Sequence, residues 1–309
     1  KKGDLSNCDN YCGITLLSVP SKIFCKIILT RIDKAIDEHL RPEQAGFRKG
    51  KGCVDQIFTL RNIIEQSIEW NAPLFINFIH FKKAFDSVHH ESLWNILKAY
   101  GIPTKTVELI KMLYQNFQCS VLLNNNMTEY FQVKTGVRQG CALSSMLFII
   151  VLDWVMRNTT KDKKRGIQWT LLTTLEDLDY ADDLALLAAL NSHQQEKTDR
   201  LDHYSSKVGL AISNPKSKTM SINTKSITPI TIKGENLEEV DDFVYLGSMI
   251  SKENSTSKDI QARLAKARSA FNRMKTIRKS QQFNIKTKIK LYNSNVKSVL
   301  LYGSECWRV

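Results

Sequence analysis

The sequence predicts an α+β fold, in which short strands are interspersed with helices. Apolar runs of strand length occupy 74–79 and 178–188, whereas apolar residues recur with helical spacing in 21–36 and 260–277. The composition agrees with this prediction, because 42% of the 309 residues are hydrophobic and 24% are charged. Such a chain has enough apolar side chains for a core, which excludes a disordered or collagen-like protein.

The first region, 1–73, is expected to begin with short strands or loops and to continue as helices. Helices are predicted at 21–36 and 54–68, and a Gly- and Lys-rich turn at 46–52 separates them. Pro73 ends this region immediately before the apolar run at 74–79, which suits a buried strand.

The middle region, 74–250, is expected to mix helices and strands. The Gly101-Ile102-Pro103 break separates the first two of its helices. The expected helices lie at about 91–100, 105–116, 142–157 and 193–208. After the strand at 74–79, the expected strands lie at 120–124, at 129–134, on either side of the acidic turn in 178–188, and near 219–223, 228–233 and 243–247.

The last region, 251–309, is predicted to be helical and is strongly basic. Serine and threonine at 255–257 can cap a helix with an apolar stripe over 260–277, and a second stripe follows over 285–299. The segment holds 14 basic and 3 acidic residues, which accounts for +11 of the chain's net charge of +13. The basic side chains expected on the outer face of the first helix are Arg263, Lys266, Arg268, Arg273, Lys275 and Arg278.

This charge has two explanations. A solvated helix face is the ordinary origin of a run of Lys and Arg. An excess this local, in a chain that is otherwise nearly balanced, favours a polyanionic partner such as nucleic acid.

No membrane span and no disulfide framework are expected. The longest apolar stretch, 146–156, contains Asp153 and is too short to cross a bilayer. The seven cysteines are scattered and odd in number, and only Cys8 and Cys12 are closely spaced, so free thiols in a reducing compartment are expected. The chain begins without methionine or a signal peptide, which favours a piece of a longer product.

The acidic turn Tyr180-Ala181-Asp182-Asp183 is the first candidate site. Asp-Asp in a turn is common and can be merely structural. Two adjacent carboxylates between apolar strands nevertheless repel each other, and a divalent cation with hard oxygen ligands, such as Mg²⁺, would compensate them.

Four other segments accompany this turn in a definite order. They read Lys82-Lys83-Ala84-Phe85-Asp86-Ser87-Val88, Thr135-Gly136-Val137-Arg138-Gln139-Gly140-Cys141, Gly209-Leu210-Ala211-Ile212-Ser213-Asn214-Pro215-Lys216 and Phe243-Val244-Tyr245-Leu246-Gly247-Ser248. Together the five segments resemble motifs A to E of reverse transcriptases, with the greatest likeness to those of non-LTR (LINE-type) retrotransposons. Residues 10–18 and 44–48 resemble fingers motifs of the same family, and 270–305 looks like the start of its thumb.

The resemblance implies a right-hand polymerase. Fingers would occupy 1–73, and a palm with a small antiparallel sheet and a helical insertion at about 90–118 would occupy 74–250. The basic helices of 251–309 would begin the thumb. The implied activity is RNA-directed DNA synthesis, by two-metal transfer of a nucleotide from a dNTP to a primer 3′-hydroxyl. The implied partners are an RNA template, a DNA primer and a dNTP, with Mg²⁺ or Mn²⁺ as cofactor, and the implied location is intracellular, nuclear when DNA is the substrate.

Site roles follow from the same resemblance, residue by residue. Asp182 and Asp183 match the metal-binding pair, and Lys216 matches a lysine that protonates pyrophosphate. For the dNTP, Arg48 matches a triphosphate ligand, Phe85 a gate against the 2′-hydroxyl, and Gln139-Gly140 a contact with the incoming nucleotide. Phe85 can equally be a core aromatic side chain. For the RNA–DNA duplex, the implied backbone contacts are Arg263, Lys266, Arg273 and Lys275.

His80 is the main departure from the family pattern. Motif A of the family has an Asp here that bridges both metals, whereas a neutral imidazole carries no charge and suits Zn²⁺ or Mn²⁺ better than Mg²⁺. Loss of about 4–6 kcal/mol of transition-state stabilisation would slow the reaction roughly 10³- to 10⁴-fold. Cys12, where the family has Arg, points the same way. We therefore expect an impaired polymerase, with a non-catalytic nucleic-acid-binding remnant as the alternative and an unrelated basic DNA-binding protein as a third possibility.

Overall fold

The computed structural model describes most of the chain. The described residues are 4, 13–115, 117–123, 125–161, 164–224 and 228–308. Cys8, Cys12 and the first three residues of the 10–18 motif therefore lie outside the described residues.

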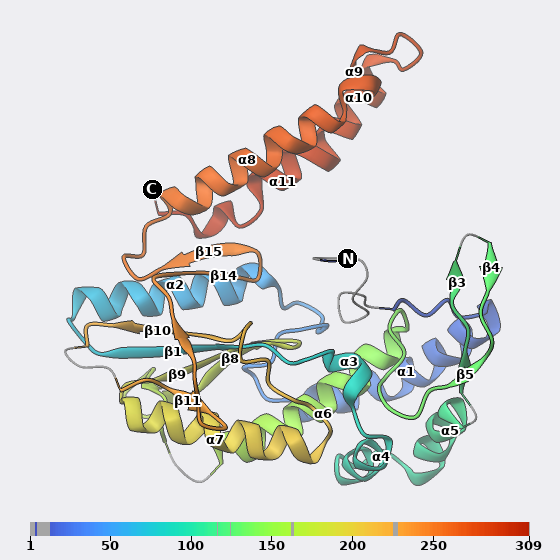
Figure 1. The fold of residues 1–309 in the computed structure, drawn as a ribbon, viewed down its shortest axis with the longest axis horizontal. Coiled ribbons are helices and arrows are strands. Elements are labelled where there is room, and N and C mark those ends of the chain that lie inside the picture. Colours follow the sequence, from blue (N-terminus) through green and yellow to red (C-terminus); the bar gives the residue numbers. More distant parts are fainter. Residues whose placement is uncertain are drawn as a thin grey trace.

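A five-stranded sheet forms the centre of the molecule (Figure 1). Its order is β13-β10-β1-β9-β8, and every neighbouring pair is antiparallel except β10 and β13. The strands are β1 (Leu74–Ile79), β8 (Asp177–Tyr180), β9 (Asp183–Ala188), β10 (Lys218–Ile222) and β13 (Glu238–Glu239). The predicted strands at 74–79, 178–188 and 219–223 are thus found side by side in one sheet.

Helices cover both faces of this sheet, as the alternation along β9 requires. Leu184 and Leu186 belong to the core shared with α6 (Ala142–Thr160) and α7 (Asn191–Lys207), whereas Ala185 and Leu187 belong to the core shared with α2 (Cys53–Glu69). Successive side chains of a strand point to opposite faces, so a strand buried on both faces is apolar throughout. Figure 1 shows α2 on one side of the sheet and α6 and α7 on the other.

Three further helices pack on α6 or on its neighbours. α1 (Val19–His39) and α4 (His90–Ala99) contact α6, and α5 (Thr104–Tyr114) contacts α4. The long apolar helix predicted at 142–157 is therefore the centre of the larger core. Among the described residues it alone is long and apolar enough to span a membrane, but 72% of its most apolar window is buried inside the molecule. This degree of burial is typical of a helix in a protein core, as α6 is.

Short hairpins project from the fold where longer strands were predicted. The expected strands at 120–124 and 129–134 are two-residue pieces: β2 (Gln118–Cys119) pairs with β5 (Phe131–Gln132), and β3 (Leu122–Leu123) with β4 (Asn126–Met127). Val121, Met127 and Tyr130 are exposed, so no core face extends the pairing. The remaining hairpins are β6 (Ile167–Gln168) with β7 (Thr174–Leu175), β11 (Thr231–Ile232) with β12 (Glu235–Asn236), and β14 (Asp242–Tyr245) with β15 (Ser248–Ser251).

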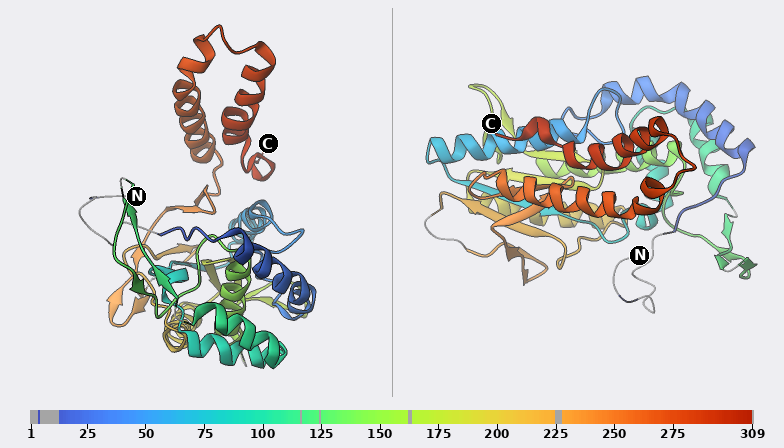
Figure 2. Two further views of the ribbon diagram at one scale, coloured as in Figure 1. Left: turned by 90° about the vertical axis from the view of Figure 1, so that its right-hand side faces the viewer. Right: turned by 90° about the horizontal axis from the view of Figure 1, so that it is seen from above.

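The basic C-terminal region is a helical hairpin that projects from the sheet layers (Figures 1 and 2). One limb is α8 (Ser257–Arg273) with the short α9 (Lys275–Lys279), and the other is α10 (Ile285–Tyr292), a π-helical turn (Asn293–Lys297) and α11 (Ser298–Leu301). α8 contacts both the π-helical turn and α11. The two helical stripes predicted from the sequence therefore lie on two limbs that contact each other, although Leu264, Ile285 and Ile289 of these stripes are exposed.

Candidate active site

The acidic turn lies at the end of the β8–β9 hairpin, beside the end of β1. Tyr180 pairs with Asp183, so Ala181 and Asp182 form a two-residue loop. Ile79 pairs with Leu184 across β1 and β9, which places the next residue, His80, beside Asp183. The Nδ1 atom of His80 lies 4.0 Å from an Oδ atom of Asp183. Residues about a hundred positions apart in sequence thus form one polar cluster, as predicted.

The backbone around His80 is held by the segment that follows α7. The amide of Ser213 donates to the His80 carbonyl oxygen at 2.8 Å, and the His80 amide donates to the Ser217 hydroxyl at 3.1 Å. This pairing brings the exposed Lys216 to the same site. Lys216, His80 and Asp183 line a pocket of about 160 Å³, together with residues of β14 and its turn.

The pKa values of Asp183 and His80 are both shifted by burial and by neighbouring charges. Burial and the adjacent Asp182 carboxylate raise the pKa of Asp183 to about 6. Burial and the Lys216 ammonium lower the pKa of His80, against the opposite effect of Asp182, so the imidazole is neutral at pH 7. A neutral ring does not stabilise the ionised form of Asp183, whereas a bound cation would.

These residues fit a divalent cation only in part. Asp182 and Asp183 supply the hard carboxylate oxygens that such a cation prefers. Among the described residues, no group of three or more His, Cys, Asp or Glu side chains lies in position to hold a metal ion. The residue that follows β1 beside Asp183 is His80, which offers a ring nitrogen where a third carboxylate oxygen would complete such a group.

Three of the residues expected to face the nucleotide, Phe85, Gln139 and Gly140, belong to two segments that lie side by side, since the Val137 amide donates to the Phe85 carbonyl oxygen. Gln139 Nε2 donates to Asp86 Oδ1 at 3.1 Å, so Asp86 is engaged on this side and does not take the place of a carboxylate at residue 80. Gly140 has φ of +99°, and a Cβ atom there would lie 2.9 Å from the Thr15 carbonyl oxygen. Only glycine therefore suits this position. Phe85 stacks on Phe148 of α6 with ring centroids 4.3 Å apart, so it is a core aromatic side chain at the edge of the site.

Arg48 is engaged by the protein itself. Its guanidinium donates to Asp37 Oδ1 at 2.6 Å, to the Asp37 carbonyl oxygen at 3.0 Å, and to the carbonyl oxygens of Arg41 and Gln44. The side chain is nearly buried. In this structure Arg48 fixes the loop between α1 and α2 and does not project toward the acidic cluster.

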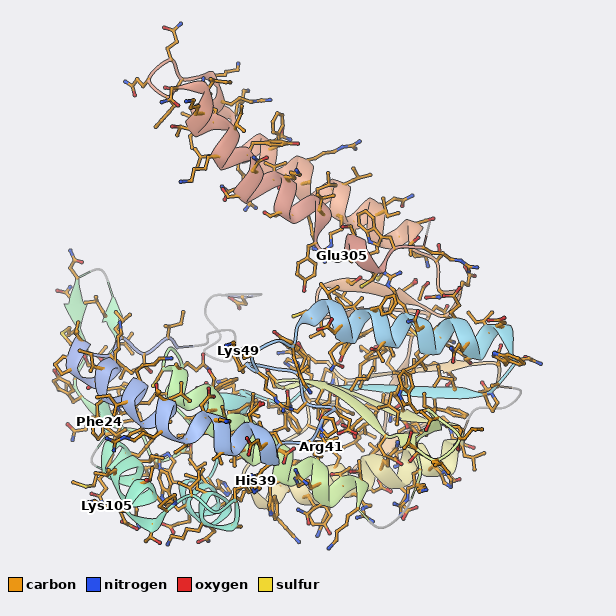
Figure 3. The ribbon with its side chains drawn as sticks, turned by 180° about the vertical axis from the view of Figure 1, so that it is seen from behind. Phe24, His39, Arg41, Lys49, Lys105 and Glu305 are labelled. Atoms are coloured by element: carbon orange, nitrogen blue, oxygen red, sulfur yellow. The ribbon has the colours of Figure 1, made fainter. Side chains whose placement is uncertain are left out.

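A buried charge network behind the cluster was not anticipated from the sequence. Arg41, just beyond α1 (Figure 3), donates to both carboxylate oxygens of Asp177 at 3.0 and 2.9 Å and also to Asp179. Its own amide donates to Asp153 of α6 at 2.9 Å. Burial and the Asp177 carboxylate raise the pKa of Asp179 despite Arg41. The sequence signal was present: Asp177 and Asp179 alternate on one face of an otherwise apolar strand, and such a pair requires a buried cation.

Arg263 does not lie on the outer face of the basic helical hairpin, so this part of the sequence-based description was wrong. It is 6% exposed, donates to the Gly247 carbonyl oxygen and lies over the Tyr302 ring at 4.4 Å. It thus links α8 to the β14–β15 turn. Because its side chain is buried, it is not accessible to an RNA–DNA duplex in solvent. Lys266, Arg273 and Lys275 are exposed, as expected.

Most of the chain matches one known protein family. The family model described as "Reverse transcriptase (RNA-dependent DNA polymerase)" matches residues 1–287. The chain belongs to the reverse transcriptase family. Its relatives are proteins of non-LTR retrotransposons, which agrees with the resemblance drawn from the motifs. Reverse transcriptases as a family use divalent metal ions.

Two curated relatives illustrate the similarity. The "Probable RNA-directed DNA polymerase from transposon BS" of Drosophila melanogaster is 25% identical over 320 residues, which cover 97% of this chain and 34% of that protein. The "Transposon TX1 uncharacterized 149 kDa protein" of Xenopus laevis is 31% identical over 153 residues, or 50% of this chain and 12% of that protein. The chain therefore spans about a third of the length of these relatives or less.

Solved structures share the fold at low identity. A telomerase from Candida tropicalis, determined with a fragment of telomeric RNA, superimposes with a TM-score of 0.54 and 12% identity, covering 93% of this chain and 46% of that one. An apo form truncated from its C-terminal domain gives a TM-score of 0.51 with 15% identity and covers 75% of this chain and 43% of that one. These matches confirm the predicted right-hand polymerase fold.

Proposed function

We propose that this reverse transcriptase chain catalyses RNA-templated extension of a DNA primer from dNTPs, at a rate strongly reduced by His80. The observation that carries the proposal is the position of Asp182 and Asp183 beside the end of β1, with His80 Nδ1 4.0 Å from Asp183. Two carboxylates thus meet the residue at which the family has its third.

The proposed cofactor is Mg²⁺, with Mn²⁺ as a substitute, held by Asp182 and Asp183. When bound, such a cation supplies charge neutralisation at the transferring phosphoryl group. Lys216 is exposed beside the pocket and can deliver a proton to the leaving pyrophosphate. Gln139, fixed by Asp86, and the tight turn at Gly140 would bound the nucleotide site, with Phe85 as its floor.

In the same proposal, residues 1–73 act as fingers, 74–250 as palm and 251–309 as the start of the thumb. The exposed Lys266, Arg273 and Lys275 would contact the phosphates of an RNA–DNA duplex without reading its sequence. A DNA primer as partner would place this activity inside the cell and in the nucleus.

Primer extension by three chains tests the proposal. The native chain, His80→Asp, and the doubly changed His80→Asp/Asp183→Asn chain are compared on one RNA template with a DNA primer, four dNTPs and Mg²⁺. The proposal requires extension by His80→Asp and its loss in the double variant. A folded His80→Asp chain that binds the duplex but never extends it would instead favour a non-catalytic nucleic-acid-binding remnant.

A further inference from the structure

The loop between α1 and α2 runs along the free edge of β8. Gln44 and Asp179 form a parallel bridge, the Ala45 amide donates to the Asp179 carbonyl oxygen at 2.8 Å, and the Asp179 amide donates to the Glu43 carbonyl oxygen at 3.4 Å. A fingers-side segment thereby extends the palm sheet by one short strand. This segment reaches the acidic turn from the side opposite β1, because β8 is the last strand of the sheet.

The Gln44 side chain bonds directly to that turn. It is fully buried, and its Oε1 accepts hydrogen bonds from the Gly46 amide at 2.7 Å and the Ala181 amide at 3.0 Å. Ala181 has φ of +53°, in the left-handed region that residues other than glycine adopt at a cost. The first position of a two-residue hairpin loop with such a φ is usually glycine. The bond from Gln44 therefore stabilises a backbone conformation that the residue itself disfavours.

Gly46 completes the contact by its lack of a side chain. A Cβ atom at Gly46 would lie 2.2 Å from Ala181 N and 2.8 Å from Ala181 Cα. Contacts this short are not tolerated, so glycine is required for the loop to approach the turn. Gln44 and Gly46 thus act on the same peptide group, one by bonding it and the other by leaving room for it.

We propose that Gln44 is a positioning residue of the reaction, which holds the Ala181 peptide so that Asp182 and Asp183 are directed toward the end of β1. The inference rests on the proposed function, because it gives Gln44 a purpose only if the two carboxylates act in catalysis. Gln44 touches neither substrate nor cation and works entirely through the turn. It also connects the fingers-side loop mechanically to the carboxylate pair, since Arg48 fixes the same loop through the Gln44 carbonyl oxygen.

The test compares two buried glutamines in the His80→Asp chain. Gln44→Met keeps the length and volume of the side chain but cannot accept the two amide hydrogen bonds. The matched control is Gln194→Met: Gln194 is also fully buried, and its Nε2 donates to the Leu186 carbonyl oxygen of β9 at 3.0 Å, away from the turn. Extension rate, duplex affinity and hydrogen exchange of the Ala181 amide are measured for each.

Gln44→Met should lower the single-turnover rate about 10- to 100-fold at unchanged duplex affinity, and it should accelerate exchange of the Ala181 amide. Gln44→Glu, which keeps an acceptor oxygen, should lose less of the rate than Gln44→Met. Gln194→Met should leave both the rate and the Ala181 exchange close to those of its parent. Equal rate losses in the two methionine variants, or unchanged Ala181 exchange in Gln44→Met, would overturn the inference.

Failure of the proposed function would look different. If the His80→Asp chain does not extend a primer at all, the function is refuted by that chain alone. The exchange measurement then still decides whether Gln44 holds the turn: normal Ala181 exchange in a folded Gln44→Met chain would refute the contact as well.

Discussion

Replacing His80 by Asp returns a carboxylate to the end of β1, and the structure indicates the size of the effect. Two unit charges at the 4.0 Å between His80 Nδ1 and Asp183 interact by about 4 kcal/mol at an effective dielectric of 20, which suits these partly exposed side chains. In His80→Asp without a bound cation, this interaction is a repulsion between the carboxylates of residues 80 and 183. A dication is attracted to each carboxylate about twice as strongly as the two repel each other, so the net gain with metal is again about 4 kcal/mol.

A gain of about 4 kcal/mol in the transition state corresponds to roughly 10³-fold in rate. Single-turnover primer extension at saturating Mg²⁺ is the direct assay. We expect the native chain to extend barely or not at all and His80→Asp to be faster by two to four orders of magnitude. Mn²⁺ should recover part of any native activity, because it accepts imidazole as a ligand along with oxygen. His80→Asn, which is neutral, is the matched control and should gain nothing.

Without metal, His80→Asp should make the protein less stable. In EDTA, His80→Asp should melt at a lower temperature than the native chain, because three carboxylates then lie together, and added Mg²⁺ should reverse the loss. Full Mg²⁺-dependent extension by the native chain, unchanged in His80→Asp, would refute the assignment of residue 80 to the metal site. A melting temperature insensitive to Mg²⁺ in both chains would refute the cation site itself.

Three further predictions concern other parts of the molecule. Replacing Lys266, Arg273 and Lys275 together by Gln should reduce the slope of log K for duplex binding against log salt by about 2.5, and an unchanged slope would make them an ordinary solvated face. Arg41→Met should lower the free energy of unfolding in urea by about 3–5 kcal/mol, since it leaves buried carboxylates unpaired; a loss below about 1 kcal/mol would contradict that role. The raised pKa of Asp183 adds stability at acid pH that is lost as pH rises from about 4 through 6 in metal-free protein. Asp183→Asn should remove that loss, and an identical pH profile of the melting temperature would disprove it.

Much of the sheet could be predicted because its strands are buried on both faces. The apolar run at 74–79 coincides with β1, and the strands around the acidic turn coincide with β8 and β9. Strands buried on both faces can be recognised in the sequence, since every side chain must be apolar or paired. Which strands are neighbours is not a local property, and the adjacency of residues 80 and 183 followed only from the order of the five motifs.

The roles of the basic residues were harder to predict, because the partner of an arginine is set by tertiary structure. Arg48 and Arg263 both stand in runs of cations, yet each donates to backbone carbonyl oxygens of a loop near it in the chain. The periodicity of α8 places Arg263 close to its apolar stripe, where its guanidinium packs over the Tyr302 ring and donates to the Gly247 carbonyl oxygen. The sequence did not indicate the contact that Gln44 makes with Ala181, since the partners of a buried amide side chain are known only once the backbone groups around it are placed.

The fold does not depend on a carboxylate at residue 80. The sheet is held by the apolar rows of β1 and β9 on both faces and by the Arg41 network behind them, and none of these contacts involves residue 80. The carboxylate cluster works against folding, as the raised pKa of Asp183 indicates, so a neutral ring at residue 80 relieves repulsion that the sheet would otherwise bear. On this reasoning an uncharged side chain at residue 80 is neutral or stabilising for the folded protein when no cation is bound, and a carboxylate there would be favourable only once a cation compensates it.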